Sequence, residues 1–135
     1  GNPGDTTTHI TASGNISASG YVLADYYVAN TASPAAAGSG IGDATAIEAT
    51  AGIQFASTDD AAKGIKLPGV ASVPIGTTYT VYNTSGTALR VYPLANDRIF
   101  PLSDDAHATV PVNASITVTA FSADGWQGFF GTVIS

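Results

Sequence analysis

Between residues 10 and 33 the chain repeats every six residues, and a β-branched residue opens each repeat. The four hexads read ITASGN, ISASGY, VLADYY and VANTAS, beginning at Ile10, Ile16, Val22 and Val28. Because six is an even number, these four side chains point the same way on an unbroken strand. The pattern therefore predicts an extended β stem with an apolar column along one side.

Four hexads are too few for a stable β-helix made from one chain, because stacked repeats depend on several neighbours. Three identical chains winding together would solve this problem, with the apolar columns filling a shared axis. We therefore expect a homotrimer whose interface consists of Ile10, Ile16, Val22, Val28, Tyr26 and Tyr27. The alternative is a pair of ordinary strands with glycine-rich turns, in which the repeat is coincidental.

Residues 47–135 alternate between apolar and polar positions in short runs that recur about every ten residues, which predicts an all-β domain. The alternation is clearest over 115–121, where Ile116 and Val118 take one face and Thr117 and Thr119 the other. This spacing is typical of a small antiparallel sandwich or barrel, jelly-roll-like, and does not choose between the two. The predicted strands cover 51–57, 64–67, 77–83, 87–92, 97–100, 107–112, 115–121 and 126–134.

Turn-forming residues set the predicted connections and the domain boundary. Asn83-Thr84-Ser85-Gly86 and Asp124-Gly125 each predict a hairpin between the strands that flank them. Residues 34–46 are small and nearly uncharged, which predicts a flexible linker. We therefore divide the chain into a stem over 1–33, a linker over 34–46 and a domain over 47–135.

Composition and charge exclude several classes of function. Four Lys and Arg residues face ten Asp and Glu residues, and the formal net charge is −6. Such an acidic chain is not expected to bind nucleic acid. The absence of cysteine excludes disulfides and thiol catalysis. No run of 18 apolar residues is present, so the sequence predicts no transmembrane helix.

The sequence offers little for catalysis or metal binding. Its two histidines are His9 and His107, and no nucleophile, phosphate-loop or metalloprotease motif is present. The acidic pairs Asp59-Asp60 and Asp104-Asp105 are explained equally well by solvated turns as by calcium ligands. We expect no enzyme, cofactor or metal.

Three aromatic side chains in the domain are candidates for a ligand or an interface. Trp126, Tyr82 and Tyr92 offer ring faces that can stack on sugars or pack on another protein. Trp126 follows a turn and precedes the apolar run FFGTVI, so packing in a core or an interface is the favoured interpretation.

Four sequence segments of the domain carry a resemblance to a known type of module. They are GIKLPG (64–69), IGTTYTVYNTSGTALRVYP (75–93), NDRIFPL (96–102) and SITVTAFSADGWQGF (115–129). Together they resemble a β module of bacteriophage virion structural proteins, over roughly residues 50–130. The hexads resemble the stems of trimeric phage fibres and decoration proteins.

This resemblance implies a non-enzymatic homotrimer on the virion exterior that contacts the major capsid protein or other virion proteins. The short chain favours a capsid decoration protein or a head fibre. One alternative is a tail-fibre or adhesin segment that binds host glycans. A second is a monomeric carbohydrate-binding sandwich, which predicts that Trp126 is exposed.

Overall fold

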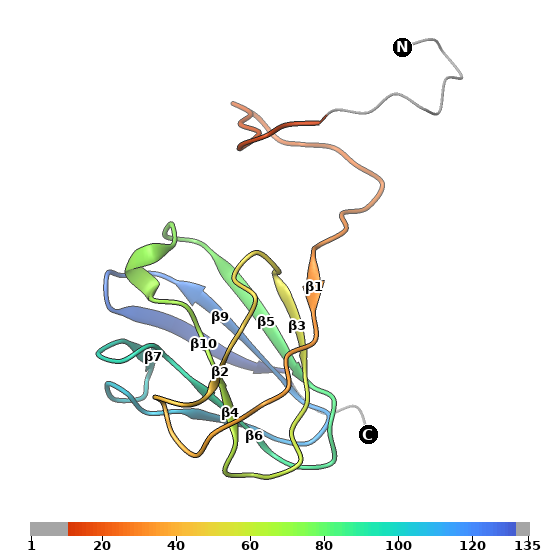
Figure 1. Cartoon of the computed structure of the whole chain (residues 1–135). Coiled ribbons are helices and arrows are strands. Elements are labelled where there is room, and N and C mark those ends of the chain that lie inside the picture. Colours follow the sequence, from red (N-terminus) through yellow and green to blue (C-terminus); the bar gives the residue numbers. More distant parts are fainter. Residues whose placement is uncertain (1–10, 132–135) are drawn as a thin grey trace.

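The computed structural model describes residues 11–131 and confirms the all-β fold class. These residues form ten strands and one short 3-10 helix, Val70–Ser72 (Figure 1). The strands are β1 (Thr31–Ala32), β2 (Thr45–Ala46), β3 (Ile53–Ala56), β4 (Gly64–Lys66), β5 (Thr78–Asn83), β6 (Leu89–Tyr92), β7 (Arg98–Phe100), β8 (Ala108–Val110), β9 (Ser115–Ala120) and β10 (Gly125–Gly131). Each predicted strand of the domain has a counterpart, although most are shorter than expected.

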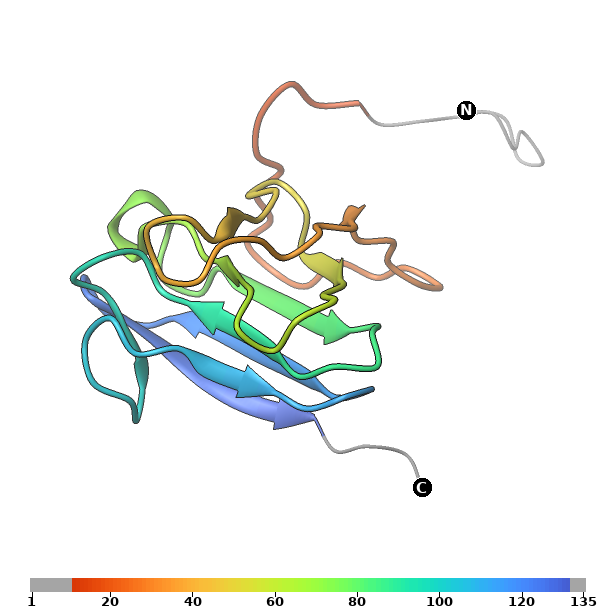
Figure 2. The same ribbon diagram turned by 60° about the horizontal axis from the view of Figure 1, so that its bottom comes forward.

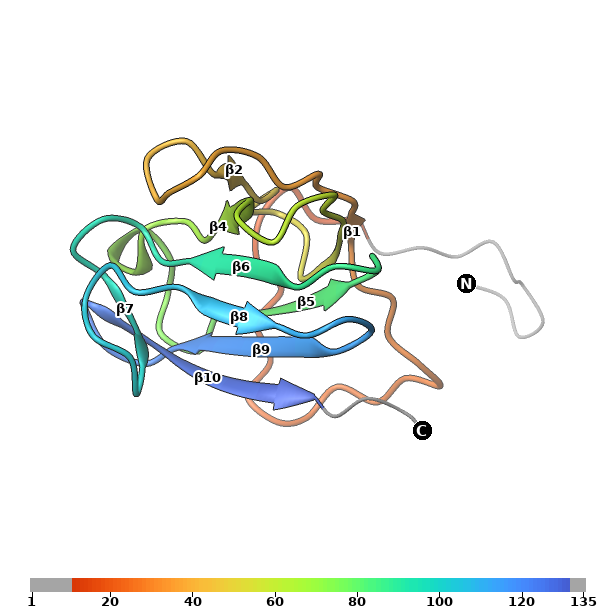
Figure 3. The ribbon, with the colours of Figure 1, turned by 90° about the horizontal axis from the view of Figure 1, so that it is seen from below.

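The strands build two sheets that share one core. The six-stranded sheet has the order β1-β3-β5-β9-β10-β7, and the four-stranded sheet has the order β2-β4-β6-β8 (Figure 3). Both sheets are mixed, because β1-β3-β5, β2-β4-β6 and β10-β7 pair in parallel. The predicted antiparallel arrangement is therefore corrected to a mixed one.

Parallel pairing arises because the chain alternates between the two sheets from β1 to β9. Each pass through one sheet and then the other makes one coil, so β1-β2, β3-β4 and β5-β6 form three stacked coils. Strands β8 and β9 then pair antiparallel to β6 and β5, and β10 follows β9. Figure 2 shows β9 and β10, in dark blue, beneath the coils.

The segment predicted as a linker belongs to the first coil. Residues 34–46 follow β1 and include β2. They bond to the next coil through Ala36 N–H to Ser57 O at 2.8 Å and Ala37 N–H to Gly64 O at 3.1 Å. Small side chains here permit close stacking of backbones rather than flexibility. The boundary between stem and domain therefore lies near residue 30.

One of the two predicted hairpins is confirmed and the other is wrong. Strands β9 and β10 form an antiparallel hairpin across the turn that ends at Asp124-Gly125. Strands β5 and β6 lie in different sheets, so the turn after Asn83 is an arch between the layers. Its geometry follows from Asn83, which is buried and bonds to backbone groups of both flanking regions.

The core lies between the sheets and is formed by the inward positions of each strand. Trp126 is fully buried and packs against Tyr79, with ring centroids 5.7 Å apart. The predicted alternation in β9 is confirmed, since Ile116 and Val118 are buried while the threonines between them face outward. Other fully buried core side chains include Ile65, Leu67, Leu89, Val91 and Val110.

Candidate functional site

Residues 11–30, called the arm, stand clear of the two sheets in Figure 1. Every residue of the arm is exposed, and none belongs to a strand in the single chain. Its contacts with the domain include a long hydrogen bond of 3.5 Å from Asn30 Nδ2 to Thr50 O. The arm therefore has no strand partner on the part of its own domain that the structure describes.

The arm carries the apolar side chains that the hexads predicted as an interface. Ile16 is 71% exposed, Val22 60% and Val28 84%, and Tyr26 and Tyr27 are 79% and 69% exposed. Ile10 lies outside the described residues. Within the arm, the Tyr27 hydroxyl donates to Val22 O at 2.6 Å. Exposed apolar groups gathered on one segment are characteristic of a surface that binds a partner.

The outer face of the six-stranded sheet is a second exposed surface, and it presents hydroxyls and rings. Thr78 and Thr119 share a hydrogen bond of 3.0 Å across β5 and β9, and Thr80 and Thr117 share one of 3.1 Å. Beside them Tyr82, 42% exposed, stacks on Phe55 with centroids 5.5 Å apart and planes inclined by 24°.

Two of the three candidate aromatics are not accessible to a ligand, and for Trp126 this agrees with the packing in a core or an interface that the sequence favoured. Trp126 has no exposed surface and Tyr92 is buried. The Tyr92 ring meets His107 edge-on, with centroids 5.1 Å apart, and its hydroxyl lies 3.3 Å from Arg90 Nη1. Trp126 is buried because it lies on the same face of its hairpin as buried Ala120.

His107 has the environment of a structural side chain. Burial lowers the pKa of His107, and the positive charge of Arg90 lowers it further. Among the described residues no hydrogen bond joins it to Asp104 or Asp105, and the Asp105 carboxylate instead accepts from the backbone N–H of Asn96 at 2.6 Å. No acid–base pair forms here.

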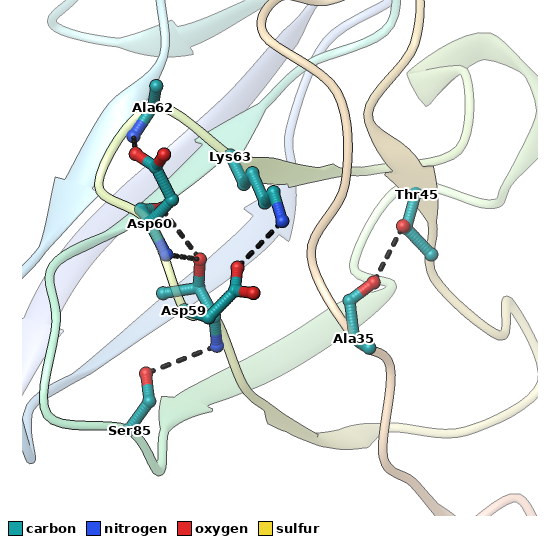
Figure 4. Close-up of polar contacts among 8 residues, drawn as sticks. Ala35, Thr45, Asp59, Asp60, Ala62, Lys63 and Ser85 are labelled. Carbon is teal, nitrogen blue, oxygen red and sulfur yellow. Dashed lines mark hydrogen bonds and ion pairs between the residues drawn. The ribbon is translucent and has the colours of Figure 1, made fainter.

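The acidic pair Asp59-Asp60 is used within its own turn (Figure 4). Asp59 Oδ1 bonds to Lys63 Nζ at 2.7 Å, and this bond lowers the pKa of the Asp59 carboxyl. Asp60 Oδ1 accepts from Ala62 N–H at 2.8 Å. Over residues 11–131 no group of three or more His, Cys, Asp or Glu side chains converges as a metal site would require.

An apolar groove runs along β8, and the sequence analysis did not predict it. Its volume is about 420 Å³, and its lining includes Ile99 from β7, Leu102, Ala108 and Thr109 from the β8 side, and Gly128 and Phe130 from β10. Phe130 is 59% exposed at its wall. One signal was available, since the neighbouring aromatics Phe129 and Phe130 must point to opposite faces of a strand.

Comparison with protein-family models, curated proteins and solved structures finds no match to this chain. In the part of the chain that the structure describes, no helix is both long and apolar enough to span a membrane. The candidate functional features are thus the arm, the groove and the outer sheet face.

Proposed function

We propose that this chain is a non-enzymatic structural protein of a bacteriophage virion, a homotrimeric capsid decoration or head-fibre protein on the capsid exterior. The observation that carries the proposal is the arm, which exposes large apolar side chains that its own domain does not cover. Burying a Val, Leu or Ile side chain is worth about 1.5–3 kcal/mol, so several such residues favour association strongly.

The virion assignment is supported by the sequence resemblance to phage structural modules and stems. The acidic charge of the chain fits an exterior location, because it keeps the protein soluble and away from the packaged genome. The expected partners are two further copies of the chain and the major capsid protein or another virion protein.

Immunogold electron microscopy of intact particles of the phage that encodes this chain tests the proposal. An antibody raised against the purified chain is expected to label the outside of the capsid. Particles treated with pre-immune serum are the control. Labelling confined to the tail would support the adhesin alternative, and an absence of labelling on intact particles would contradict a virion-exterior role.

The tail-fibre or adhesin alternative has one observation in its favour. The Phe55–Tyr82 pair and the threonine rows place flat rings beside hydroxyls on the outer face of β3, β5 and β9, an arrangement suited to stacking on sugars. The carbohydrate-binding module predicted an exposed Trp126, and because Trp126 is buried we do not propose that function.

A further inference from the structure

The two sheets are unequal, and this leaves part of the inner surface uncovered. The four-stranded sheet ends at β8, which pairs with β6 on one side and with no described strand on the other. The facing sheet continues past β9 to β10 and β7. The apolar groove is the space beyond β8, where a fifth strand of the smaller sheet would lie.

The groove has the chemistry of a site for an uncharged, extended segment. None of its lining residues is Lys, Arg, Asp or Glu, and the lining includes Ala108 and Thr109 of β8, whose outer edge no described strand covers. A chain laid on a free edge gains backbone hydrogen bonds, and its alternate side chains enter the adjoining pocket. Phe130 and Ile99 supply the apolar contacts such side chains need.

The arm has the matching pattern. From residue 16 to residue 28, every even position is apolar or small: Ile16, Ala18, Gly20, Val22, Ala24, Tyr26 and Val28. Such residues share one face of a strand, and the other face alternates less cleanly, with Ser17, Ser19 and Asp25 beside the apolar residues Tyr21, Leu23 and Tyr27. No charged residue occurs between positions 11 and 24. The arm therefore matches the groove in both its pattern and its lack of charge.

We propose that the groove beside β8 receives the arm of a second copy of this chain, as an added strand of the four-stranded sheet. The inference deepens the proposed function and rests on it, since it names the surface through which copies join. The mechanism is donation of an apolar strand face to a neighbour, with no covalent step.

A second copy is favoured over the arm's own domain by where the arm begins. It enters the six-stranded sheet at β1, and β7 lies at the opposite edge of that sheet (Figure 1). The groove is lined by residues of β7 and β10, so it lies near that far edge. Five strand spacings separate β1 from β7, about 24 Å in all. The arm leads away from its own sheets (Figure 1), and its twenty residues span about 66 Å when extended, which is long enough to reach a neighbouring copy.

The proposed exchange of arms would also produce a closed assembly of copies. Each chain has one arm to donate and one groove to accept it, which makes a head-to-tail contact between different surfaces. Repeated contacts of this kind close into a ring when the rotation between copies permits it. A ring of three would satisfy every arm and every groove.

The test compares adjacent phenylalanines that face opposite sides of β10. Phe130→Asp places a charge in the groove, and Phe129→Asp places one on the outer face, where Phe129 is 66% exposed. Both positions are largely exposed, so both variants should fold, which circular dichroism and thermal melting check. In light scattering after size exclusion, Phe130→Asp is expected to reduce the native mass from three times 13.5 kDa to 13.5 kDa. Phe129→Asp is expected to keep the wild-type mass.

Two adjacent residues of the arm provide a second pair of test and control variants. Val22 lies on the apolar face and Leu23 on the opposite face of an extended arm. Val22→Asp is expected to lower the native mass as Phe130→Asp does, and Leu23→Asp is expected to leave it unchanged.

The outcomes separate this inference from the proposed homotrimer. If the wild type is trimeric and Phe130→Asp remains so, the groove is not the acceptor, and the shared-axis stem becomes the better account. Equal loss of mass in both phenylalanine variants would also overturn the inference, because the effect would not be specific to the groove. A wild type of single-chain mass would overturn both the exchange and the homotrimer.

Discussion

At the scale of single residues, the buried side chain of Asn83 makes more hydrogen bonds than that of Gln54, the other buried polar residue that the structure describes. Its amide nitrogen donates to Thr87 O at 2.8 Å, Val110 O at 3.1 Å and Pro111 O at 3.2 Å, and its oxygen accepts from Ser85 N–H at 3.0 Å. These bonds tie the end of β5 to the start of β6 and to the end of β8, so they hold the arch between the two sheets.

Asn83→Ala is expected to lower the free energy of unfolding by about 2–3 kcal/mol, because buried carbonyls lose their donor. Asn83→Asp keeps the shape and the acceptor but loses the donors, so a loss at least as large is expected. Denaturant unfolding at a fixed protein concentration measures both. Asn30→Ala, in the exposed arm, serves as the control. A change below about 0.5 kcal/mol in both Asn83 variants would show that the arch does not depend on this side chain.

The alternation in the sequence predicted which strand residues are buried in the core, but it did not settle the roles of Asn83 and Trp126. Alternation identified Ile116 and Val118 as buried, because a strand with one face in the core must alternate. It did not identify Asn83 as a structural anchor, since a turn-forming Asn is equally common in hairpins. It also left two interpretations of Trp126 open, a ligand contact or a packed side chain, because burial depends on the neighbours of a side chain in space.

At the scale of elements, the defining feature is the stacking of three coils by parallel strands. One close approach lies between β4 and β6, where Gly64 pairs with Arg90. A Cβ at Gly64 would lie 2.7 Å from the Tyr92 ring and 2.9 Å from Arg90 O. The glycine therefore sets how tightly the second and third coils pack.

Gly64→Ala is expected to destabilise the domain by about 1–3 kcal/mol, because the extra methyl group forces the coils apart. Gly86→Ala is the matched control, since a Cβ at Gly86 meets nothing within 4 Å. Thermal unfolding measures both variants. Equal melting temperatures for wild type and Gly64→Ala would contradict the tight stacking of the coils.

Strand positions were predictable from sequence, but strand partners were not. Alternation located β5 and β6 and a turn sequence lay between them, so a hairpin was the simplest prediction. Pairing is decided instead by which backbone edges lie side by side in the folded chain, and that is a long-range property. For the same reason the small residues over 34–46 were interpreted as a linker, although their smallness permits close coil stacking.

At the scale of the whole molecule, a well-packed domain is joined to an arm that contributes nothing to its core. The candidate site is therefore incomplete in one chain: the arm has an apolar face without an acceptor, and the groove is an acceptor without an occupant. The hexads predicted an interface on the arm. The groove was not predictable, because it exists only where two sheets of unequal width face each other.

The native mass of the full chain, measured by light scattering after size exclusion, tests the central claim most directly. We predict three times 13.5 kDa, and no decrease when salt is raised, because the arm residues proposed to associate are almost uncharged. A mass of 13.5 kDa under all conditions would contradict the account, since the arm would then stay exposed without a partner.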